Sequence, residues 1–251
     1  MPKPKWVWSA WGKHPLAKDY IQLGAATSLS KAFAGWMAKG YRRLSSQADD
    51  EGPACAWRFW AKGDRRHTLL CGTIQTSSDT IGRPFPLLLM GSGPVNGWQK
   101  HWPLIPPALD GTWRRLEHLS SYKGDDIRSF GEVLATLAAP RPSWRDLRKK
   151  YAPGLFSEHS PGLAAVPHGK DHLGRYAGQQ VAWCRLQAHH GARLLTQSLE
   201  FHDLIHRGSE GPPSVVFMGG VPSAAYIAFF QRSLNSADFA RLWRPTITDP
   251  V

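Results

Sequence analysis

The chain has 251 residues, of which 42% are hydrophobic and 12 are tryptophans, so it can build a packed core, and intrinsic disorder is not the default expectation. No run approaches the roughly 18 apolar residues that span a bilayer, and residues 1–6 lack a signal-peptide core, so we expect a cytoplasmic protein without membrane insertion. The net charge of +12 is spread over short basic groups without a nucleic-acid reading module, which makes solvated basic surfaces the favoured interpretation over nucleic-acid binding.

The first third of the chain predicts a strand, a helix and then three strands. Residues 5–11 are rich in β-formers, with two tryptophans and an alanine on one face, and this strand ends at Gly12. Apolar residues at helical spacing predict a helix over residues 29–44, capped by Ser28 or Ser30. Three short β-forming runs separated by turns predict strands at 55–60, 67–74 and 85–90.

The middle of the chain is dense in glycine and proline. Residues 91–109 therefore predict a crossover. The following segments have helical spacing and capping signals, and they predict helices at 112–121, 126–138 and 143–151. Residues 153–178 return to irregular sequence and are expected to be the most mobile part.

The last third predicts a strand at 181–186, a helix at 194–207 and a buried strand at 215–218. An apolar stripe over 226–233 predicts another helix, and Ser236 is the expected cap of the last one.

Taken together, the elements favour an α/β protein of the α+β type, with a mixed, mainly antiparallel sheet sandwiched by helices, because no βαβ period runs through the chain. We expect a single domain over 1–251. Its parts would be a core at 5–95, a helical and irregular insertion at 96–178, and a strand and helix part at 179–251 that completes the fold.

The polar segment 77–87 has the most restricted backbone of the chain. Gly82 tolerates positive φ, and the two prolines near it fix their own φ near −65°. Asp79 can accept hydrogen bonds from backbone N–H groups that follow it. Such a stiff loop presents the Arg83 guanidinium in few directions, so Asp79 and Arg83 either brace the loop or bind a partner.

Two histidines, His202 and His206, lie four residues apart on a predicted helix and would share a face, as helical zinc ligands do. His168 and His172 could supply a third ligand. The metalloprotease pattern has glutamate directly after the first histidine, where this chain has Asp203, so surface or core histidines are the favoured interpretation. We expect no metal and no cofactor.

Other catalytic patterns do not occur in the sequence. There is no GxSxG elbow, and the cysteines at 55, 71 and 184 lie in apolar surroundings that predict buried, reduced thiols. The glycine-rich turns at 91–94 and 219–220 complete neither a dinucleotide-binding nor a P-loop motif. We therefore expect no catalytic residue and no small-molecule substrate.

Three stretches in chain order resemble one protein family. They are Trp11-Gly12-Lys13-His14-Pro15 with Lys18-Asp19-Tyr20, then Trp57-Arg58-Phe59, then Ser77-Ser78-Asp79 with Gly82-Arg83-Pro84-Phe85-Pro86-Leu87. They are similar to the TagF (also called ImpM) family of type VI secretion accessory proteins. In that family a G-K-x-P-x-x-G-D-F phrase, a W-R-F strand and an S-x-D-x-x-G-R-x-F-P-L segment follow one another. This chain departs from the pattern at Lys18 and Tyr20, where the family has glycine and phenylalanine.

The resemblance implies a cytoplasmic, non-enzymatic regulator that restrains the type VI secretion machine after translation, as a repressor. Members of the family are thought to bind another component of the machine, with a forkhead-associated scaffold protein as the usual candidate partner. The implied fold is an α/β sandwich with a largely antiparallel sheet.

The motif residues divide into two groups. The polar ones are candidates for partner binding or for bracing the fold, and they are Lys13, Asp19, Arg58, Asp79 and Arg83. We consider an internal salt bridge of Asp19 with Arg83 or Arg58. The others are expected to build the fold, and they are Gly12, Pro15, Trp57, Phe59, Ser77, Gly82, Pro84, Phe85 and Pro86. Two alternative functions stay open: a metal-dependent hydrolase using His202 and His206, and a basic nucleic-acid-binding protein.

Overall fold

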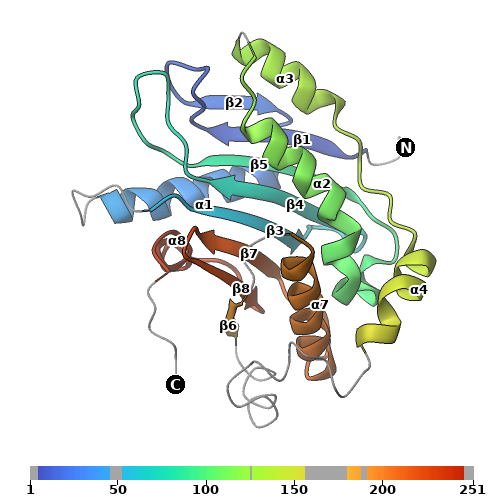
Figure 1. Ribbon diagram of the computed structural model, residues 1–251. Coiled ribbons are helices and arrows are strands. Elements are labelled where there is room, and N and C mark those ends of the chain that lie inside the picture. Colours follow the sequence, from blue (N-terminus) through green and yellow to red (C-terminus); the bar gives the residue numbers. More distant parts are fainter. Residues whose placement is uncertain (1–4, 46–52, 125, 156–179, 188–190, 246–251) are drawn as a thin grey trace.

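The protein is built on one eight-stranded sheet with helices on both of its faces (Figure 1). The computed structural model describes residues 5–45, 53–124, 126–155, 180–187 and 191–245. The strands are β1 (Val7–Gly12), β2 (Ile21–Gly24), β3 (Ala56–Lys62), β4 (Thr68–Gln75), β5 (Leu87–Pro94), β6 (Val181–Leu186), β7 (Val215–Val221) and β8 (Ala224–Phe230). The helices are α1 (Ser28–Ser45), α2 (Ile105–Ser120), α3 (Ile127–Thr136), α4 (Trp144–Leu155), α7 (Gly191–Arg207) and α8 (Ser236–Trp243). Short 3-10 turns precede α2 at Trp98–Lys100 and Trp102–Leu104.

The strands follow the order β2-β1-β5-β4-β3-β7-β8-β6, and every pair among these described strands is antiparallel. Antiparallel neighbours can be joined by short connections, as β3 and β4 or β7 and β8 are here. Helices α2, α3, α4 and α7 lie on one face of the sheet, and α1 and α8 lie on the other (Figure 1). The predicted α+β class with a sheet sandwiched by helices is confirmed.

Two hydrophobic cores lie on the two faces of the sheet. Strand β3 contributes to both, because successive side chains of a strand point to opposite faces. Trp60 points into the core beneath α2, α3 and α7, where its ring lies near those of Trp98 and Trp102. Trp57 and Phe59 point into the core beneath α1 and α8. The sheet therefore fixes the position of helices on both sides of it.

The first third of the chain has the predicted order of elements with one addition. Strands β1, β3, β4 and β5 and helix α1 occupy the predicted segments, and β2 is a short edge strand that we did not predict. The cap of α1 also differs, because the Ser30 N–H donates to Thr27 Oγ1 (3.1 Å). Thr27 is therefore the capping residue in place of Ser28 or Ser30.

Residues 91–94 belong to strand β5, which corrects the predicted crossover at this point. The glycines are there because Trp6, which directly precedes the neighbouring strand β1, and Trp8 of that strand cover them. A Cβ atom on Gly91 would lie 2.4 Å from Trp6 Nε1, and one on Gly93 would lie 2.7 Å from the Cα atom of Trp6. Helix α2 begins at Ile105, earlier than predicted, since prolines are tolerated in the first turn of a helix.

Residues 224–230 form strand β8 and not the predicted helix. The whole strand is buried between β7 and β6, and such a continuous apolar run has no period that separates a buried strand from a buried helix. The last helix is capped by Asn235, whose side chain accepts from the Asp238 N–H, and not by Ser236. Most of the segment predicted to be mobile, 156–178, lies outside the described residues.

The three cysteines, Cys55, Cys71 and Cys184, are buried thiols that form no disulfide, as predicted. Burial raises the pKa of Cys55 to about 12, which disfavours its thiolate. Among the described helices, none has the length and apolar content needed to cross a bilayer.

Candidate functional site

A buried carboxylate, Asp79, holds together a loop pair that consists of residues 13–20, between β1 and β2, and residues 76–86, between β4 and β5. Its Oδ2 lies 2.9 Å from Lys13 Nζ and 2.7 Å from Arg83 Nε, and its Oδ1 accepts the Arg83 N–H at 3.0 Å. Burial raises the pKa of Asp79, but the hydrogen bonds from Lys13 and Arg83 outweigh it and hold this pKa below its ordinary value. Asp79 is therefore ionised at neutral pH and binds both cations.

Further hydrogen bonds join one loop of the pair to the other. The Arg83 guanidinium donates to the carbonyl of Lys18 (2.8 Å), and the Thr80 N–H donates to the carbonyl of Ala17 (3.0 Å). Gly82 adopts a φ of +83°, which is accessible to glycine without strain and lets the turn close. The loop pair is thus fixed by contacts on both of its segments.

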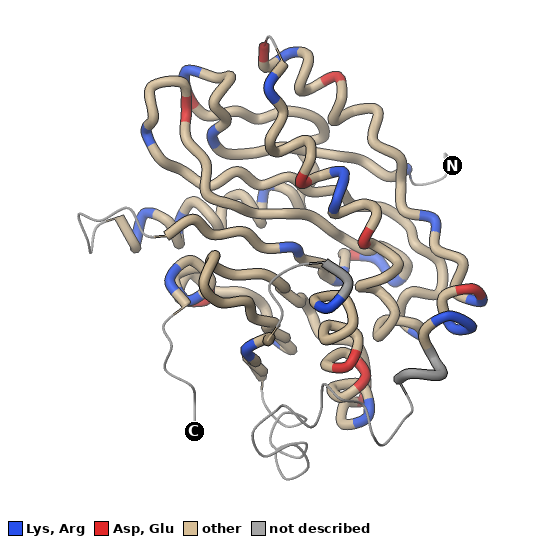
Figure 2. Tube along the Cα trace, in the orientation of Figure 1, with Lys and Arg blue, Asp and Glu red and all other residues tan. Residues whose placement is uncertain are grey.

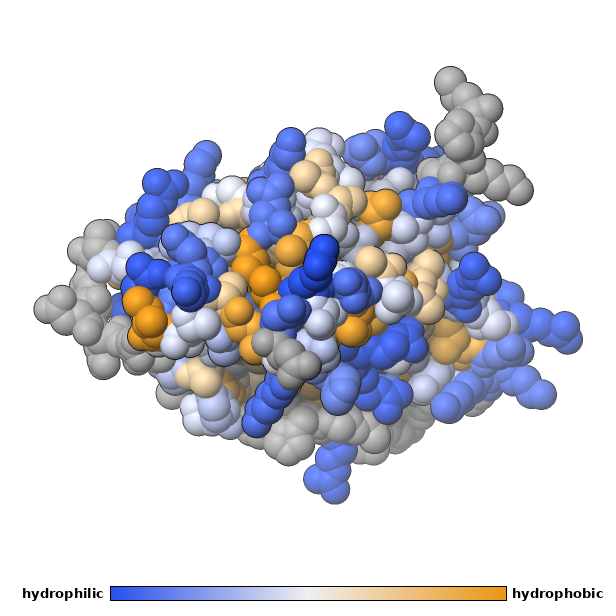
Figure 3. Space-filling view, turned by 90° about the horizontal axis from the view of Figure 1, so that it is seen from above, coloured by the Kyte–Doolittle hydropathy of each residue, from blue (hydrophilic) through white to orange (hydrophobic). Residues whose placement is uncertain are grey.

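Among the exposed side chains of the loop pair, we call three the loop surface: Tyr20, Ile81 and Arg83. Tyr20 is 60% exposed and Ile81 is 72% exposed, while the Arg83 side chain is 53% exposed. Tyr20 rests with its ring edge on Phe85, 4.7 Å between centroids. Among the described residues the other exposed large hydrophobic side chain is Val133 on α3. Figure 3, a view from above Figure 1, shows hydrophobic patches between hydrophilic side chains.

A groove of about 480 Å³ lies between the loop pair and helices α1 and α8. The loop pair contributes Pro15, Ser77 and Phe85 to its walls, α1 contributes Tyr41, and α8 contributes Trp243. None of the described residues that line it is charged, so this part of the groove is suited to an uncharged segment of a binding partner.

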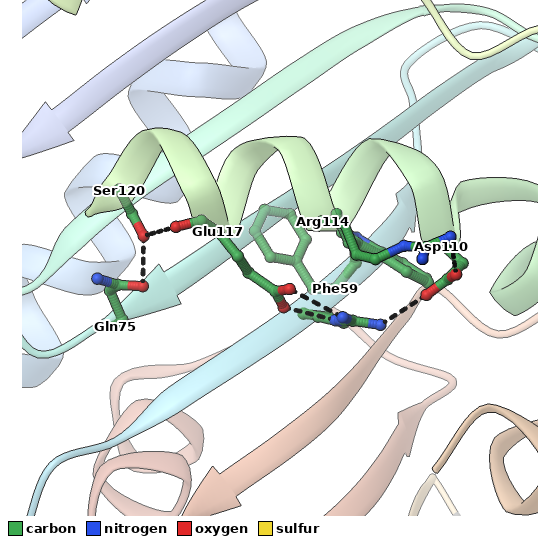
Figure 4. Close-up of polar contacts among 8 residues, drawn as sticks. Phe59, Gln75, Asp110, Arg114, Glu117 and Ser120 are labelled. Carbon is green, nitrogen blue, oxygen red and sulfur yellow. Dashed lines mark hydrogen bonds and ion pairs between the residues drawn. The ribbon is translucent and has the colours of Figure 1, made fainter. Parts of the chain in front are cut away.

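Arg58 forms a second charged cluster, away from the loop pair and beneath helix α2. Its Nε and one Nη donate to the two carboxylate oxygens of Glu117 (2.6 and 2.8 Å), and the other Nη lies 3.1 Å from Asp110. Asp110 also binds Arg114 (2.8 Å), and the Arg58 guanidinium lies 5.8 Å from the Trp113 ring centroid. Burial lowers the pKa of Arg58, but Glu117 and Asp110 outweigh it and raise this pKa overall. Figure 4 shows Glu117 and Asp110 turned toward the sheet from α2.

Asp19 forms neither of the salt bridges that we considered for it. Its carboxylate is exposed and accepts the N–H of the next residue, Tyr20 (2.8 Å). Arg83 is paired with Asp79 because both lie in the same turn, and Arg58 is paired across the core with α2. The structure therefore brings Lys13, Asp79 and Arg83 together and separates them from Asp19 and Arg58.

Sequence reasoning missed the partners of Arg58. Asp110 and Glu117 are spaced by two helical turns, so they share one face of α2. That spacing was a usable signal, but the predicted helix began at residue 112 and left Asp110 outside it.

Comparison with known proteins shows which family the chain belongs to. Residues 9–139 match the TagF N-terminal domain, which is described as type VI secretion system-associated. The chain belongs to the TagF family. The match contains both the loop pair and the Arg58 cluster, whereas β6, β7 and β8 lie beyond it and extend the same sheet.

The fold of this TagF-family chain also occurs in a solved structure. The crystal structure of PA0076 from Pseudomonas aeruginosa PAO1 has a TM-score of 0.58 to it, with 97% of each chain covered, at 16% sequence identity. At this identity the similarity concerns the fold alone. A search of curated proteins found no match.

The TagF motif residues outside the polar set have structural contacts. Gly12 has a φ of +118°, and a Cβ atom there would lie 1.9 Å from the carbonyl oxygen of Pro86. Trp57 is buried and its Nε1 donates to the carbonyl of Leu242 in α8 (3.0 Å), and Phe59 is also buried. The remaining ones lie in the loop pair, and they are Pro15, Ser77, Gly82, Pro84, Phe85 and Pro86.

His202 is a buried, neutral histidine whose two ring nitrogens are both occupied. Trp60 Nε1 donates to its Nε2 (3.0 Å), and because an indole N–H only donates, the imidazole proton is on Nδ1, which donates to the carbonyl of Ser198 (2.6 Å). His206 is exposed and lies against Trp102. This geometry does not fit the zinc pair that we considered. His168 and His172 lie outside the described residues, and within these no three metal-binding side chains gather.

The buried His202 predicts a loss of stability in mild acid. Burial lowers its pKa from 6.5 to about 3. A lowered pKa means that the neutral ring stabilises the fold above pH 6.5, and that this contribution falls as the pH decreases from 6.5 toward about 3. The slope from this one group is at most about 1.4 kcal/mol per pH unit. Urea unfolding between pH 7 and pH 4 should show that the free energy of unfolding depends less steeply on pH in the His202→Gln variant than in the wild type. Glutamine keeps an acceptor for the Trp60 N–H. Equal slopes for both proteins would contradict the assignment.

Proposed function

We propose that this TagF-family chain is a non-enzymatic accessory protein of the type VI secretion system that represses the system in the cytoplasm by binding another of its components. The family match supports the association with type VI secretion. The proposed contact is the loop surface of Tyr20, Ile81 and Arg83. The observation that carries the proposal is that the ion pairs of the buried Asp79 fix the loop surface, while Tyr20 and Ile81 of this surface stay exposed to solvent.

The chemistry of the loop surface suits a protein partner. Tyrosine and arginine are among the residues that contribute most to the binding free energy of protein interfaces. Covering an exposed large hydrophobic side chain with a partner is also favourable, because its apolar surface is removed from water. The braced backbone lowers the cost of binding, because little conformational entropy remains to be lost. The uncharged groove beside the loop pair offers a place for a segment of the partner.

We take a forkhead-associated scaffold protein of the secretion system as the first candidate partner, as the family resemblance suggests. The Asp79 and Arg58 clusters have internal partners, so we assign them to bracing. Arg83 has both roles in this proposal, because one part of its guanidinium binds Asp79 and the side chain is still half exposed.

The test uses the native cell with its own gene replaced. We expect the wild-type chain to lower type VI secretion when its level is raised, and the double variant Tyr20→Ser/Ile81→Ser to lower it much less at the same abundance. Val133→Ser is the matched control, since Val133 is a large hydrophobic side chain that is exposed outside the loop pair. Repression by the double variant at the wild-type level would exclude the loop surface, and increased secretion with the wild-type chain would reverse the proposed sign.

A further inference from the structure

Strand β4 has different surfaces at its two ends. The loop pair lies beyond its last residue, and a hairpin loop of residues 63–67 precedes its first, Thr68. Because β4 is eight residues long, the two lie about 25 Å apart. The Gly63 N–H donates to the carbonyl of Thr68 (3.0 Å), which closes the hairpin loop, and the side chains of residues 64–67 are exposed. The hairpin loop therefore belongs to an end of the molecule that is remote from the loop surface.

Two hydrogen bonds place helix α4 beside this hairpin loop. The Val95 N–H donates to the carbonyl of His67 (2.9 Å), and Trp144 Nε1, at the start of α4, donates to the carbonyl of Asn96 (2.7 Å). The Trp144 ring also lies 5.2 Å from the ring of His101, between centroids. The hairpin loop, the turn after β5 and α4 are far apart in the sequence, and they meet at one end of the sheet.

Basic residues predominate on the segments that meet here. Arg145, Arg148 and Lys149 fall within an arc of about 100° on the exposed side of α4, and Figure 2 shows basic residues on this helix. The pKa of His101 is lowered by burial and by the nearby charges of Arg148 and Lys100, so cations from α4 and from the turn before it lie close together. Nine exposed cations lie on residues 62–67, 96–101 and 141–151. We call them the basic end, and they are Lys62, Arg65, Arg66, Lys100, Arg141, Arg145, Arg148, Lys149 and Lys150.

Acidic residues balance only part of this charge. The loop of residues 208–214 adjoins the hairpin, because the Lys62 N–H donates to the carbonyl of Ser214 (2.9 Å). This loop and the segments of the basic end contain three acidic residues, namely Asp64, Asp146 and Glu210. Among the residues that the structure describes, none of the nine cations forms an ion pair. The basic end therefore has an excess of positive charge.

The neighbouring segments outside the described residues cannot cancel this excess. Residues 156–179, which directly follow α4 in the sequence, contain two acidic and two basic residues. Residues 1–4 and 188–190 contain no acidic residue. The acidic residues 49–51 precede Ala56 in the sequence, and Ala56 is at the opposite end of β3 from Lys62. The positive charge of the basic end is thus available to a binding partner.

We propose that the basic end is a second interaction surface, and that it binds an acidic segment of a partner protein. Five of its nine cations are arginines, whose N–H donors match the two oxygens of a carboxylate. This inference goes beyond the proposed function, because it concerns another surface and specifies the charge of what binds there. Since the loop surface lies beyond the other end of β4, both surfaces can be occupied at once.

Two observations favour a protein segment over nucleic acid or a membrane. Asp64 and Asp146 interrupt the positive charge, and they would repel the uniform negative charge of a duplex or of an anionic bilayer, whereas a protein can place neutral or basic side chains opposite them. The described large hydrophobic side chains that are exposed, Tyr20, Ile81 and Val133, lie on the loop pair and on α3. None of them is at the basic end, where it could stack on a base or insert into a bilayer.

The experiment measures the binding of a defined acidic probe to the full chain. The probe is a fluorescent 16-residue peptide of alternating glutamate and serine, titrated by anisotropy at about 0.15 M salt, where interactions over more than about 8 Å are screened. Arg65→Glu/Arg66→Glu changes the hairpin loop and Arg145→Glu/Arg148→Glu changes α4. Each should weaken binding at least about fivefold, because the two segments form one surface. Lys31→Glu/Lys39→Glu makes the same change of net charge at exposed positions on α1, and it should weaken binding less than about twofold. Circular dichroism confirms that the three variants are folded.

Other outcomes would overturn the proposal. Equal loss in all three double variants would mean that only net charge attracts the probe, and loss in only one of the first two would mean that the hairpin loop and α4 do not act as one surface. A wild-type chain that does not bind the peptide would also exclude it. Tighter binding of a duplex DNA or of anionic phospholipid vesicles, weakened by both of the first two variants, would assign the basic end to that ligand.

Carbodiimide coupling of the wild-type chain to the peptide gives a reading that needs no variant. Cross-links are expected at Lys62, Lys100 and Lys149, and an even spread over all exposed lysines would contradict the proposal. Because the probe is a defined peptide, these results do not depend on the loop surface or on its candidate partner.

Discussion

Replacing Gly12 by alanine is expected to lower the free energy of unfolding by about 3 kcal/mol, one of the largest effects of any single methyl group in this protein. Two causes act together. The φ of +118° at Gly12 is strained for any residue with a side chain, and the new Cβ would lie 1.9 Å from the carbonyl oxygen of Pro86. That oxygen belongs to the residue directly before Leu87, which pairs with Gly12 at the end of β1 and the start of β5. It therefore cannot move without breaking the hydrogen-bonded ladder between β1 and β5.

The matched control for Gly12 is Gly35, which receives the same methyl group. Gly35 lies inside α1 with open space where the Cβ would go, so alanine should stabilise the protein there by about 0.5–1 kcal/mol through its higher helix propensity. Urea unfolding followed by circular dichroism measures both. If the urea midpoint of Gly12→Ala equals that of the wild type, the close approach of Gly12 to the Pro86 carbonyl is contradicted.

Arg58→Met should destabilise the protein by about 2 kcal/mol, because it leaves the carboxylates of Asp110 and Glu117 without their shared cation. Fully buried pairs lose about 3–5 kcal/mol when one partner is removed. The smaller value follows from solvent screening, since the Glu117 side chain is 41% exposed. Methionine keeps much of the length of the arginine side chain, so the loss of charge dominates the change.

A double-mutant cycle separates this pairing from simple loss of packing. Glu117→Gln in the Arg58→Met background removes one unpaired carboxylate, so it should restore part of the lost stability, whereas Glu117→Gln in the wild-type background should destabilise. Additive effects of the two changes would show that Arg58 and Glu117 do not interact.

Much of the fold could be predicted because its local signals agree with its packing. Helix α1 has apolar residues at a clear helical period, and β1, β3 and β4 are β-forming runs bounded by turn residues. Strand β8 could not be assigned in this way, because all of its residues are buried on both faces and the period that identifies a half-buried strand is missing. The extent of β5 was hidden by Gly91 and Gly93, whose role depends on contacts with Trp6 and Trp8, which are distant in the sequence.

The candidate site was only partly predictable. The glycine and prolines around Arg83 indicated a stiff loop, and Asp79 was recognised as an acceptor for the turn that follows it. The ion pair of Lys13 with Asp79 joins two segments far apart in the sequence, so no local pattern reports it. The exposure of Tyr20 and Ile81 is likewise a property of the packed loop pair, since apolar residues are usually expected inside.

The central claim is that the loop surface binds a component of the secretion system, and a titration of purified proteins tests it most directly. The chain is titrated against the forkhead-associated scaffold by isothermal calorimetry as wild type, as Tyr20→Ser/Ile81→Ser and as Val133→Ser. We predict that the double variant binds at least about tenfold more weakly, whereas Val133→Ser binds as the wild type does. Equal affinity of the wild type and the double variant would contradict the claim, and a wild-type chain that does not bind would contradict the choice of partner.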